Sequence, residues 1–133
     1  MGPRIVQMTT RQFADTTLAQ PVGRIDHRSA PDFEAALAPL VAAAVERRGA
    51  LVLDFAGVDY ISSVGLRVLM LLGRQMRAGQ AKVALAALQS VVAEIFAIAR
   101  FDKILPVAPT VEEALAACSA EALAAFRAAH PIG

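Results

Sequence analysis

Two uninterrupted apolar runs constrain the fold of this chain more than any other feature of the sequence. "ALVLDF" occupies residues 50–55 and "KVALAAL" occupies residues 82–88, and each run is too short for a buried helix. Such runs are typical of strands that are buried on both faces, as in a parallel sheet covered by helices. The chain has 133 residues, 56% of them hydrophobic, which is enough for one domain with a real core. We therefore predict an α/β fold.

Further strands are expected on either side of these two. Residues 4–9 and 16–25 predict a first hairpin, with "ADTT" at its turn. Pro21 would confine the second strand of this hairpin to an edge or a bulge, and Gly23 would end its pairing. A last short strand is expected around residues 105–107.

Four segments have apolar residues at helical spacing and helix-ending residues at their boundaries. Pro39 should kink the first helix or mark a broken turn, and Gly79 is a candidate left-handed cap of the second. Ser90 can cap the third helix, and Thr110 and Glu113 have the spacing of a capping box before the fourth. The predicted helices cover residues 29–49, 63 to about 78, 90–100, and 110 onward with a break near Ser119.

The order of these elements predicts the architecture. Two strands and a helix are followed by three strand and helix units, which implies a mixed, mainly parallel sheet of four to five strands with about four helices packed on it. We expect a single domain over residues 1–133, with a core over about 4–117 and an Ala-rich helix and tail over 118–133. Exposed strand edges leave a homodimer open.

Composition argues against several classes of function. The formal charge of +1 gives no electrostatic reason for direct nucleic-acid binding. The most apolar run, "VLMLL" at 68–72, is far too short for membrane insertion. The lone Cys118 cannot form an internal disulfide and fits a reducing cytoplasm, and the amino terminus lacks the apolar core of a signal peptide. No metal-ligand spacing and no nucleotide-binding motif is present, so we expect no metal and no cofactor.

The stretch "GVDYISSVGLRVLML" at 57–71 places two serines where a strand pattern gives way to a helix pattern. The simplest interpretation is a helix N-cap, which is worth about 1 kcal/mol relative to alanine. A nucleophile elbow would need glycine at the position of Ile61, and only His27 and His130 could serve as bases. We therefore expect no catalytic residue and no enzymatic activity.

Three stretches together resemble a STAS domain of the anti-sigma factor antagonist kind. They are "VGRIDHRSA" at 22–30, "LVLDFAGVDYISSVGLRVL" at 51–69 and "EIFAIARFDKILPVAPTVEEAL" at 94–115. The resemblance implies a STAS-like fold and a regulator that acts by switching partners. In its unphosphorylated form it would bind an anti-sigma factor with serine kinase activity. Phosphorylation by that kinase would release it, and a serine phosphatase would reset it.

The same resemblance implies which residues act. Aligning Gly65 and Leu66 with the family's Asp-Ser-Ser-Gly-Leu motif places the phosphate acceptor at Ser63. Ser62 replaces the aspartate and Val64 replaces the second serine, which makes Ser62 a rival acceptor. These altered flanks also permit an alternative function as a non-switching STAS scaffold or transporter accessory subunit. The implied partner-binding residues are Asp26, Ile61, Ser62, Val64, Gly65 and Leu66.

Asp26 has two interpretations that the sequence leaves open. From the local pattern it is a turn or cap residue that precedes the first helix. The resemblance implies instead that it lies beside the phosphate acceptor, in the surface that meets the kinase. Neighbouring strand ends in one sheet would make that placement geometrically reasonable.

Overall fold

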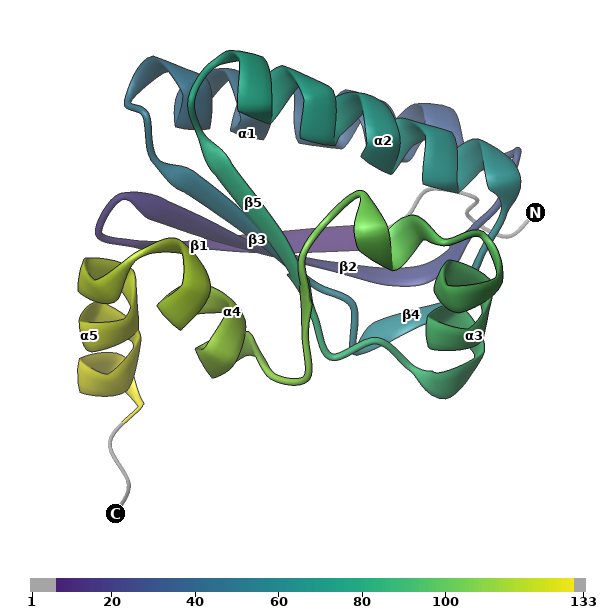
Figure 1. Ribbon diagram of the computed structural model, residues 1–133. Coiled ribbons are helices and arrows are strands. Elements are labelled where there is room, and N and C mark those ends of the chain that lie inside the picture. Colours follow the sequence, from purple (N-terminus) through teal and green to yellow (C-terminus); the bar gives the residue numbers. More distant parts are fainter. Residues whose placement is uncertain (1–6, 131–133) are drawn as a thin grey trace.

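The computed structural model describes residues 7–130, in which a mixed sheet carries helices on both faces (Figure 1). The α/β prediction is confirmed, and the described residues form one strand more than the four to five expected. The strands are β1 (Gln7–Phe13), β2 (Thr16–Ile25), β3 (Ala50–Asp54), β4 (Gly57–Ile61), β5 (Lys82–Ala86) and β6 (Val107–Ala108). The helices are α1 (Ala30–Glu46), α2 (Ser63–Ala78), α3 (Ser90–Ile98), α4 (Val111–Cys118) and α5 (Ala120–Ala129), with a 3₁₀ turn η1 (Phe101–Lys103).

The extra strand is β4, which the sequence interpretation merged with the end of β3. The sheet order is β1-β2-β3-β5-β6, with β1 antiparallel to β2 and the other pairs parallel. β3 pairs with residues 16–19 of β2, and β4 pairs with residues 22–25 of the same strand. Only Phe55 and Ala56 separate β3 from β4. The apolar run that predicted a strand covers residues 50–55, so it accounts for β3 and not for β4.

Two expectations about β2 are wrong. β2 lies inside the sheet, between β1 on one side and β3 and β4 on the other. Pro21 stands in the gap between the β3 and β4 ladders, where no amide donor is required toward that side. Gly23 does not end the pairing; it has φ +117° beside a register shift, and β2 continues to Ile25. Glycine tolerates this backbone conformation, which suits it to a bulge.

The ends of the first two helices also differ in detail from the sequence interpretation. α1 is continuous across Pro39, and α2 spans the predicted residues 63–78. Gly79 is not left-handed, because its φ is −89° and Gln80 takes the positive φ of 60° instead. A β-carbon on Gly79 would lie 2.4 Å from Cγ1 of Val45. Glycine at 79 therefore permits a close approach of the α2 end to α1.

The later helices are capped mostly as expected. Thr110 accepts a hydrogen bond from the Glu113 amide at 3.1 Å, which confirms the cap of α4. Ser119 marks the predicted break and caps α5 by accepting from the Ala122 amide at 3.1 Å. Ser90 is not a cap, because it is the first residue of α3 and the N-cap position belongs to Gln89.

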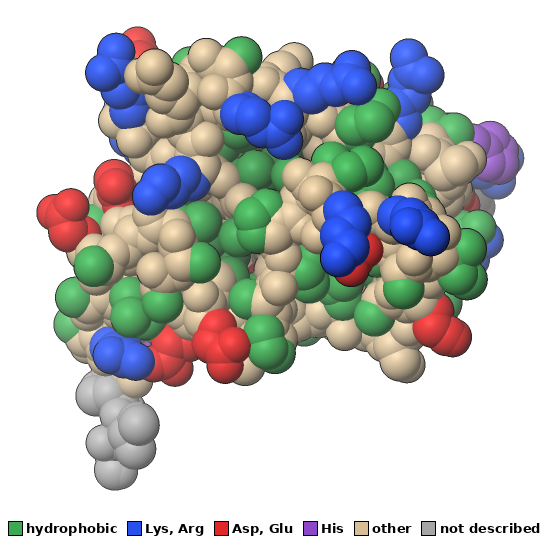
Figure 2. Space-filling model, in the orientation of Figure 1, with side chains coloured by type: hydrophobic (Ala, Val, Ile, Leu, Met, Phe, Trp, Pro, Cys, Tyr) green, Lys and Arg blue, Asp and Glu red, His purple; other side chains and the backbone are tan. Residues whose placement is uncertain are grey.

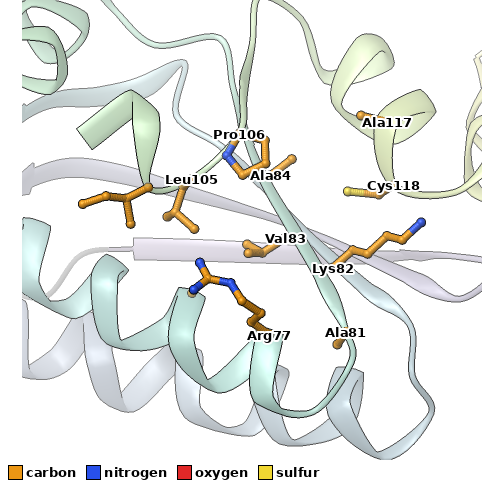
Figure 3. Close-up of a pocket in the computed structure, with 11 residues that line it drawn as sticks. Arg77, Ala81, Lys82, Val83, Ala84, Leu105, Pro106, Ala117 and Cys118 are labelled. Atoms are coloured by element: carbon orange, nitrogen blue, oxygen red, sulfur yellow. The ribbon is translucent and has the colours of Figure 1, made fainter. Parts of the chain in front are cut away.

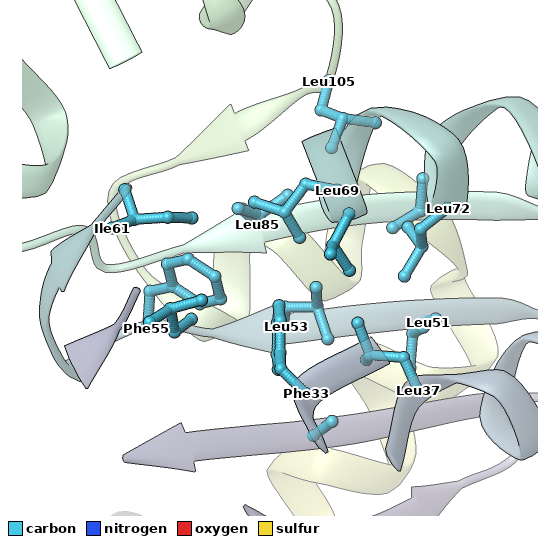
Figure 4. Close-up of a cluster of buried hydrophobic side chains, with 14 of the residues drawn as sticks. Phe33, Leu37, Leu51, Leu53, Phe55, Ile61, Leu69, Leu72, Leu85 and Leu105 are labelled. Carbon is cyan, nitrogen blue, oxygen red and sulfur yellow. The ribbon is translucent and has the colours of Figure 1, made fainter. Parts of the chain in front are cut away.

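The core forms two layers, one on each face of the sheet. α1 and α2 cover one face and α4 and α5 cover the other, whereas α3 packs beside β4 (Figure 1). Packing continues beyond residue 117, since Ala122 is fully buried and the Phe126 ring meets the Phe13 ring edge-on at 5.4 Å. None of the helices among residues 7–130 has the length and apolarity that crossing a bilayer requires. Figure 4 shows the larger layer, which includes Phe33, Leu37, Leu51, Leu53, Phe55, Ile61, Leu69, Leu72, Leu85 and Leu105.

Candidate functional site

The strand ends of β2 and β4 bring the predicted site residues to one edge of the sheet. Ile25 and Ile61, the last residues of the two strands, are paired in the parallel register. The Ser62 amide then donates to the Ile25 carbonyl oxygen at 2.8 Å. Asp26 follows Ile25 directly, so it and the serine pair leave neighbouring strand ends. The sequence analysis expected Asp26 and the serines at neighbouring strand ends of one sheet, and the structure has this arrangement.

The two serines have different surroundings. Ser62 is half-buried at the N-cap position of α2, and its Oγ accepts a hydrogen bond from the Gly65 amide at 3.2 Å. Ser63 is the first residue of the helix, and its side chain is exposed. Within residues 7–130, no hydrogen-bond partner occupies the Ser63 hydroxyl. The capping interpretation therefore holds for Ser62, and Ser63 carries the accessible hydroxyl.

The residues beneath this junction are core residues. Ile61 is 1% exposed and Gly65 is buried, so in the free protein neither residue offers a surface of its own to a partner. A β-carbon on Gly65 would lie 2.7 Å from Cγ1 of Ile61 and 2.8 Å from Cγ2 of Ile25. Glycine at 65 lets the first turn of α2 rest on the two strand ends. Val64 remains 43% exposed, and Leu66 is half-buried against the core.

Asp26 organises the turn between β2 and α1, as its local pattern predicted. Its Oδ1 accepts from the amides of Arg28 at 2.9 Å and Ser29 at 3.1 Å, and its Oδ2 accepts from Arg24 Nε at 3.1 Å. The Ser29 amide is the largest influence on the Asp26 carboxyl group. Together with the Arg28 amide and the Arg24 guanidinium, it outweighs partial desolvation and holds the pKa of Asp26 below its ordinary value.

We expect the charge of Asp26 to stabilise the protein in a pH-dependent way. A pKa lowered by folding contributes stability above the unfolded pKa, near 3.8, which is lost as the pH falls through the folded value. Asp26→Asn keeps an oxygen acceptor for the turn and removes only the charge. The variant should unfold at lower urea concentration than the wild type at pH 7. The difference should shrink toward pH 3, and a difference that does not change with pH would contradict the assignment.

The sequence interpretation missed a contact between Arg24 and Tyr60 at the same edge. The Arg24 guanidinium lies 4.0 Å from the centroid of the Tyr60 ring, a cation–π distance, while it also pairs with Asp26. Arg24 and Tyr60 each precede the final isoleucine of their strand, and they face each other in the register. No local sequence pattern predicts this contact, because it depends on the pairing of β2 with β4.

Polar side chains hold the two-residue connection between β3 and β4, and in this way they fix the position of β4 and of the serines that follow it. Asp54 accepts from the Ala56 amide at 3.0 Å and from Gln20 Nε2 at 2.9 Å. Gln89 Nε2 donates to the Ala56 carbonyl at 2.7 Å, which ties the same loop to the start of α3. Asp54 is thus a structural residue that holds the two-residue connection from β3 to β4.

Within residues 7–130 no metal-binding cluster lies at this end of the sheet, and His130 lies elsewhere. No group of three or more His, Cys, Asp or Glu side chains within residues 7–130 could hold a metal ion. His130 stacks on Phe126, with ring centroids 4.3 Å apart, beside the final turn of α5. Figure 1 places α5 at the opposite end of the sheet from the start of α2. His130 is therefore not positioned as a base for Ser63.

Comparison with known proteins agrees with this geometry. Residues 7–114 match the family model of the STAS domain. The chain is 43% identical over 95 residues to BtrV of Bordetella bronchiseptica, a protein assigned provisionally as an anti-sigma factor antagonist; the match covers 71% of this chain and 79% of BtrV.

Solved structures share the fold. The crystal structure of an anti-sigma factor antagonist from Mycobacterium paratuberculosis has a TM-score of 0.77 at 24% identity, covering 88% of this chain and 97% of that one. The Bacillus cell fate determinant SpoIIAA in its phosphorylated form has a TM-score of 0.60 at 15% identity, covering 84% and 98%. At these identities the two structures show a common fold.

The family model spans most of the chain, and the similarity to BtrV extends over most of both proteins. The chain therefore belongs to the STAS domain family and, within it, to the anti-sigma factor antagonists, which are binding proteins and not enzymes.

Proposed function

We propose that this protein binds an anti-sigma factor with serine kinase activity while unphosphorylated, and that phosphorylation of Ser63 by this kinase releases it. One observation carries the choice of residue. Ser63 presents an exposed hydroxyl at the first position of α2, whereas the hydroxyl of the rival Ser62 is engaged as the helix cap. A kinase could reach Ser63 without disturbing the cap.

The fold should tolerate a phosphate at this position. A phosphoserine carries a charge of about −1.5 to −2 and strong acceptor oxygens. At the start of α2 it would meet the positive end of the helix dipole and amides of the first turn that lack helical partners. The modification would therefore leave the domain folded, so any effect on binding must come from the contact with the partner.

The partner surface we propose surrounds Ser63 at the ends of β2 and β4. Asp26, Ser62, Val64 and Leu66 offer accessible atoms there, and Ile61 and Gly65 support them from below. A partner packed over Val64 would desolvate a phosphate on its neighbour. Burying such a charge without a counterion costs several kcal/mol, which is enough to break a complex.

Two of the related proteins support this mechanism. BtrV carries a provisional assignment as an anti-sigma factor antagonist, and SpoIIAA has been solved in a phosphorylated form with the same fold. We propose that the present protein acts likewise in the cytoplasm, with a serine phosphatase to reset it and with no direct contact to nucleic acid. Homodimer formation stays a prediction.

The proposal is tested by locating phosphate on the protein recovered from its own cells, both growing and stressed. Peptide mass spectrometry should find phosphate on Ser63 in an amount that changes with condition. Ser63→Ala should abolish it. Ser62→Ala should keep it, although loss of the cap should lower the free energy of unfolding by about 1 kcal/mol.

Two results would overturn the choice of Ser63. Phosphate on Ser62 that persists in Ser63→Ala would make Ser62 the acceptor. A complete absence of phosphate under every condition, with this peptide well covered, would favour the non-switching scaffold or transporter accessory subunit. The replacement of the family's aspartate and second serine by Ser62 and Val64 is the observation that favours this second function.

A further inference from the structure

A cleft lies at the opposite end of α2 from Ser63, against the open edge of the sheet. β6 pairs with only Leu85 and Ala86 of β5, which leaves the beginning of β5 without a strand on that side. A cavity of about 230 Å³ occupies this place, between α2 and α4 (Figure 3). Its apolar lining comes from Val83, Ala84, Leu105, Pro106, Ala117 and Cys118.

A second hollow of about 300 Å³ adjoins the first. It is lined by Met70, Arg74, Arg77, Lys103 and Ile104. Arg77 and Ile104 line both hollows, so the two hollows are neighbours that share part of their walls, and together they are called the cleft below. Ile104 is 38% exposed, which leaves an apolar side chain open to solvent between the two parts.

The charged residues that line this cleft are all cationic. Arg74, Arg77, Lys82 and Lys103 line it, and no acidic side chain belongs to either lining. The ion pairs found among residues 7–130 involve none of these four cations. The whole chain carries a formal charge of only +1, so the cleft concentrates positive charge that the rest of the molecule balances. Figure 2 shows Lys and Arg side chains gathered over this face around a hollow floored by hydrophobic groups.

The four cationic residues are exposed, and they lie beside the apolar wall of the cleft. In Figure 3 the Arg77 side chain points toward Leu105, and the Lys82 side chain extends toward Cys118. Burial raises the pKa of the Cys118 thiol to about 11; the nearby charge of Lys82 partly opposes this rise, and that of Asp15 adds to it. Cations that only cover a solvated helix face would not line a cavity, whereas these four side chains do.

We propose that this cleft binds a small phosphate monoester with an apolar body. The first hollow exceeds the roughly 150 Å³ of a dry cavity that holds benzene, so a single ring fits it. Arg77 and Arg74 can hold phosphate oxygens with paired N–H donors, and Lys103 adds a third positive charge. A phosphate dianion would neutralise more of the positive charge of these three cations than a single carboxylate would. The cleft does not depend on the phosphorylation proposed for Ser63.

Phenyl phosphate is the probe that tests this site, in a titration of the ¹⁵N-labelled chain followed by NMR. We expect saturable amide shifts confined to the lining of the cleft, at residues 70, 73, 74, 77, 81–84, 103–105 and 117–118, with none at Ser63. Inorganic phosphate lacks the aromatic ring, and benzyl alcohol has a ring but lacks the phosphate. Each should therefore bind at least tenfold more weakly than phenyl phosphate. Equal binding of inorganic phosphate, or shifts that do not saturate, would overturn the proposal.

Matched variants separate the charge and the pocket. Arg77→Gln should weaken phenyl phosphate at least tenfold, which corresponds to about 1.4 kcal/mol, while Arg67→Gln on the same helix should change nothing. Ala117→Phe should fill the apolar hollow and block phenyl phosphate, whereas Ala116→Phe, on the same helix but outside the lining of the hollow, should not. Equal losses within either pair would overturn the site. Ser63→Ala should bind phenyl phosphate normally, which keeps this result distinct from the switching proposal.

Discussion

Ser63→Asp is expected to weaken binding to the anti-sigma factor kinase about a hundredfold, or ~3 kcal/mol. The aspartate places a permanent negative charge beside Val64, where the proposed partner excludes water. The same charge at the first position of α2 is favourable for the helix, so the variant should stay folded. Isothermal titration calorimetry with the purified kinase measures the affinity, and a thermal melt of the free variant checks the fold.

Ser63→Ala is the matched control for this experiment. It removes the hydroxyl without adding charge and leaves the Ser62 cap in place, so it should bind within a few-fold of the wild type. Ser62→Ala should also bind, because it alters the cap and not the charge of the surface. If Ser63→Ala and Ser63→Asp bind the kinase equally, the partner does not contact this part of α2 and the switching mechanism is wrong.

Phe55→Ala is expected to lower the free energy of unfolding by about 3–5 kcal/mol. Phe55 is fully buried in the two-residue connection between β3 and β4, and its ring centroid lies 6.5 Å from that of Phe33 on α1. Truncation would leave a cavity between the sheet and α1, at the loop that positions β4. Urea denaturation at pH 7 measures the loss.

Two further variants calibrate this prediction. Phe55→Leu keeps an apolar side chain of smaller size and should lose clearly less stability than Phe55→Ala. Val91→Ala changes a side chain that is 53% exposed on α3 and should lie within about 0.5 kcal/mol of the wild type. If Phe55→Ala lowers the free energy of unfolding by less than about 1 kcal/mol, the connection between β3 and β4 does not depend on this packing.

Local periodicity was sufficient for most of the helices and central strands. α2 spans the residues that its pattern predicted, because a stripe of apolar side chains and a capping serine are both properties of neighbouring residues. The buried strands β3 and β5 likewise follow from short apolar runs. The two serines were recognised at the strand-to-helix junction for the same reason. Each of these features depends on contacts within a few positions along the chain.

The environment of each residue at the candidate site depended on contacts that the sequence does not encode locally. Pairing with β2 made residues 57–61 a separate strand, placed Ile61 in the core, and set Arg24 against Tyr60. The choice between Ser62 and Ser63 rests on which hydroxyl reaches the Gly65 amide. That hydrogen bond depends on where α2 begins, since Ser62 holds the N-cap position and Ser63 is the first helical residue.

The cationic cleft shows the same division between sequence and structure at a larger scale. Its lysines and arginines come from α2, the start of β5 and the turn after α3, and along the chain each resembles an ordinary surface charge. Periodicity reports which face of a single element is buried. It carries no information about which elements meet, because that depends on strand order and side-chain packing across the whole domain. The fold class therefore followed from the sequence, and the surfaces available for binding followed from the assembled sheet.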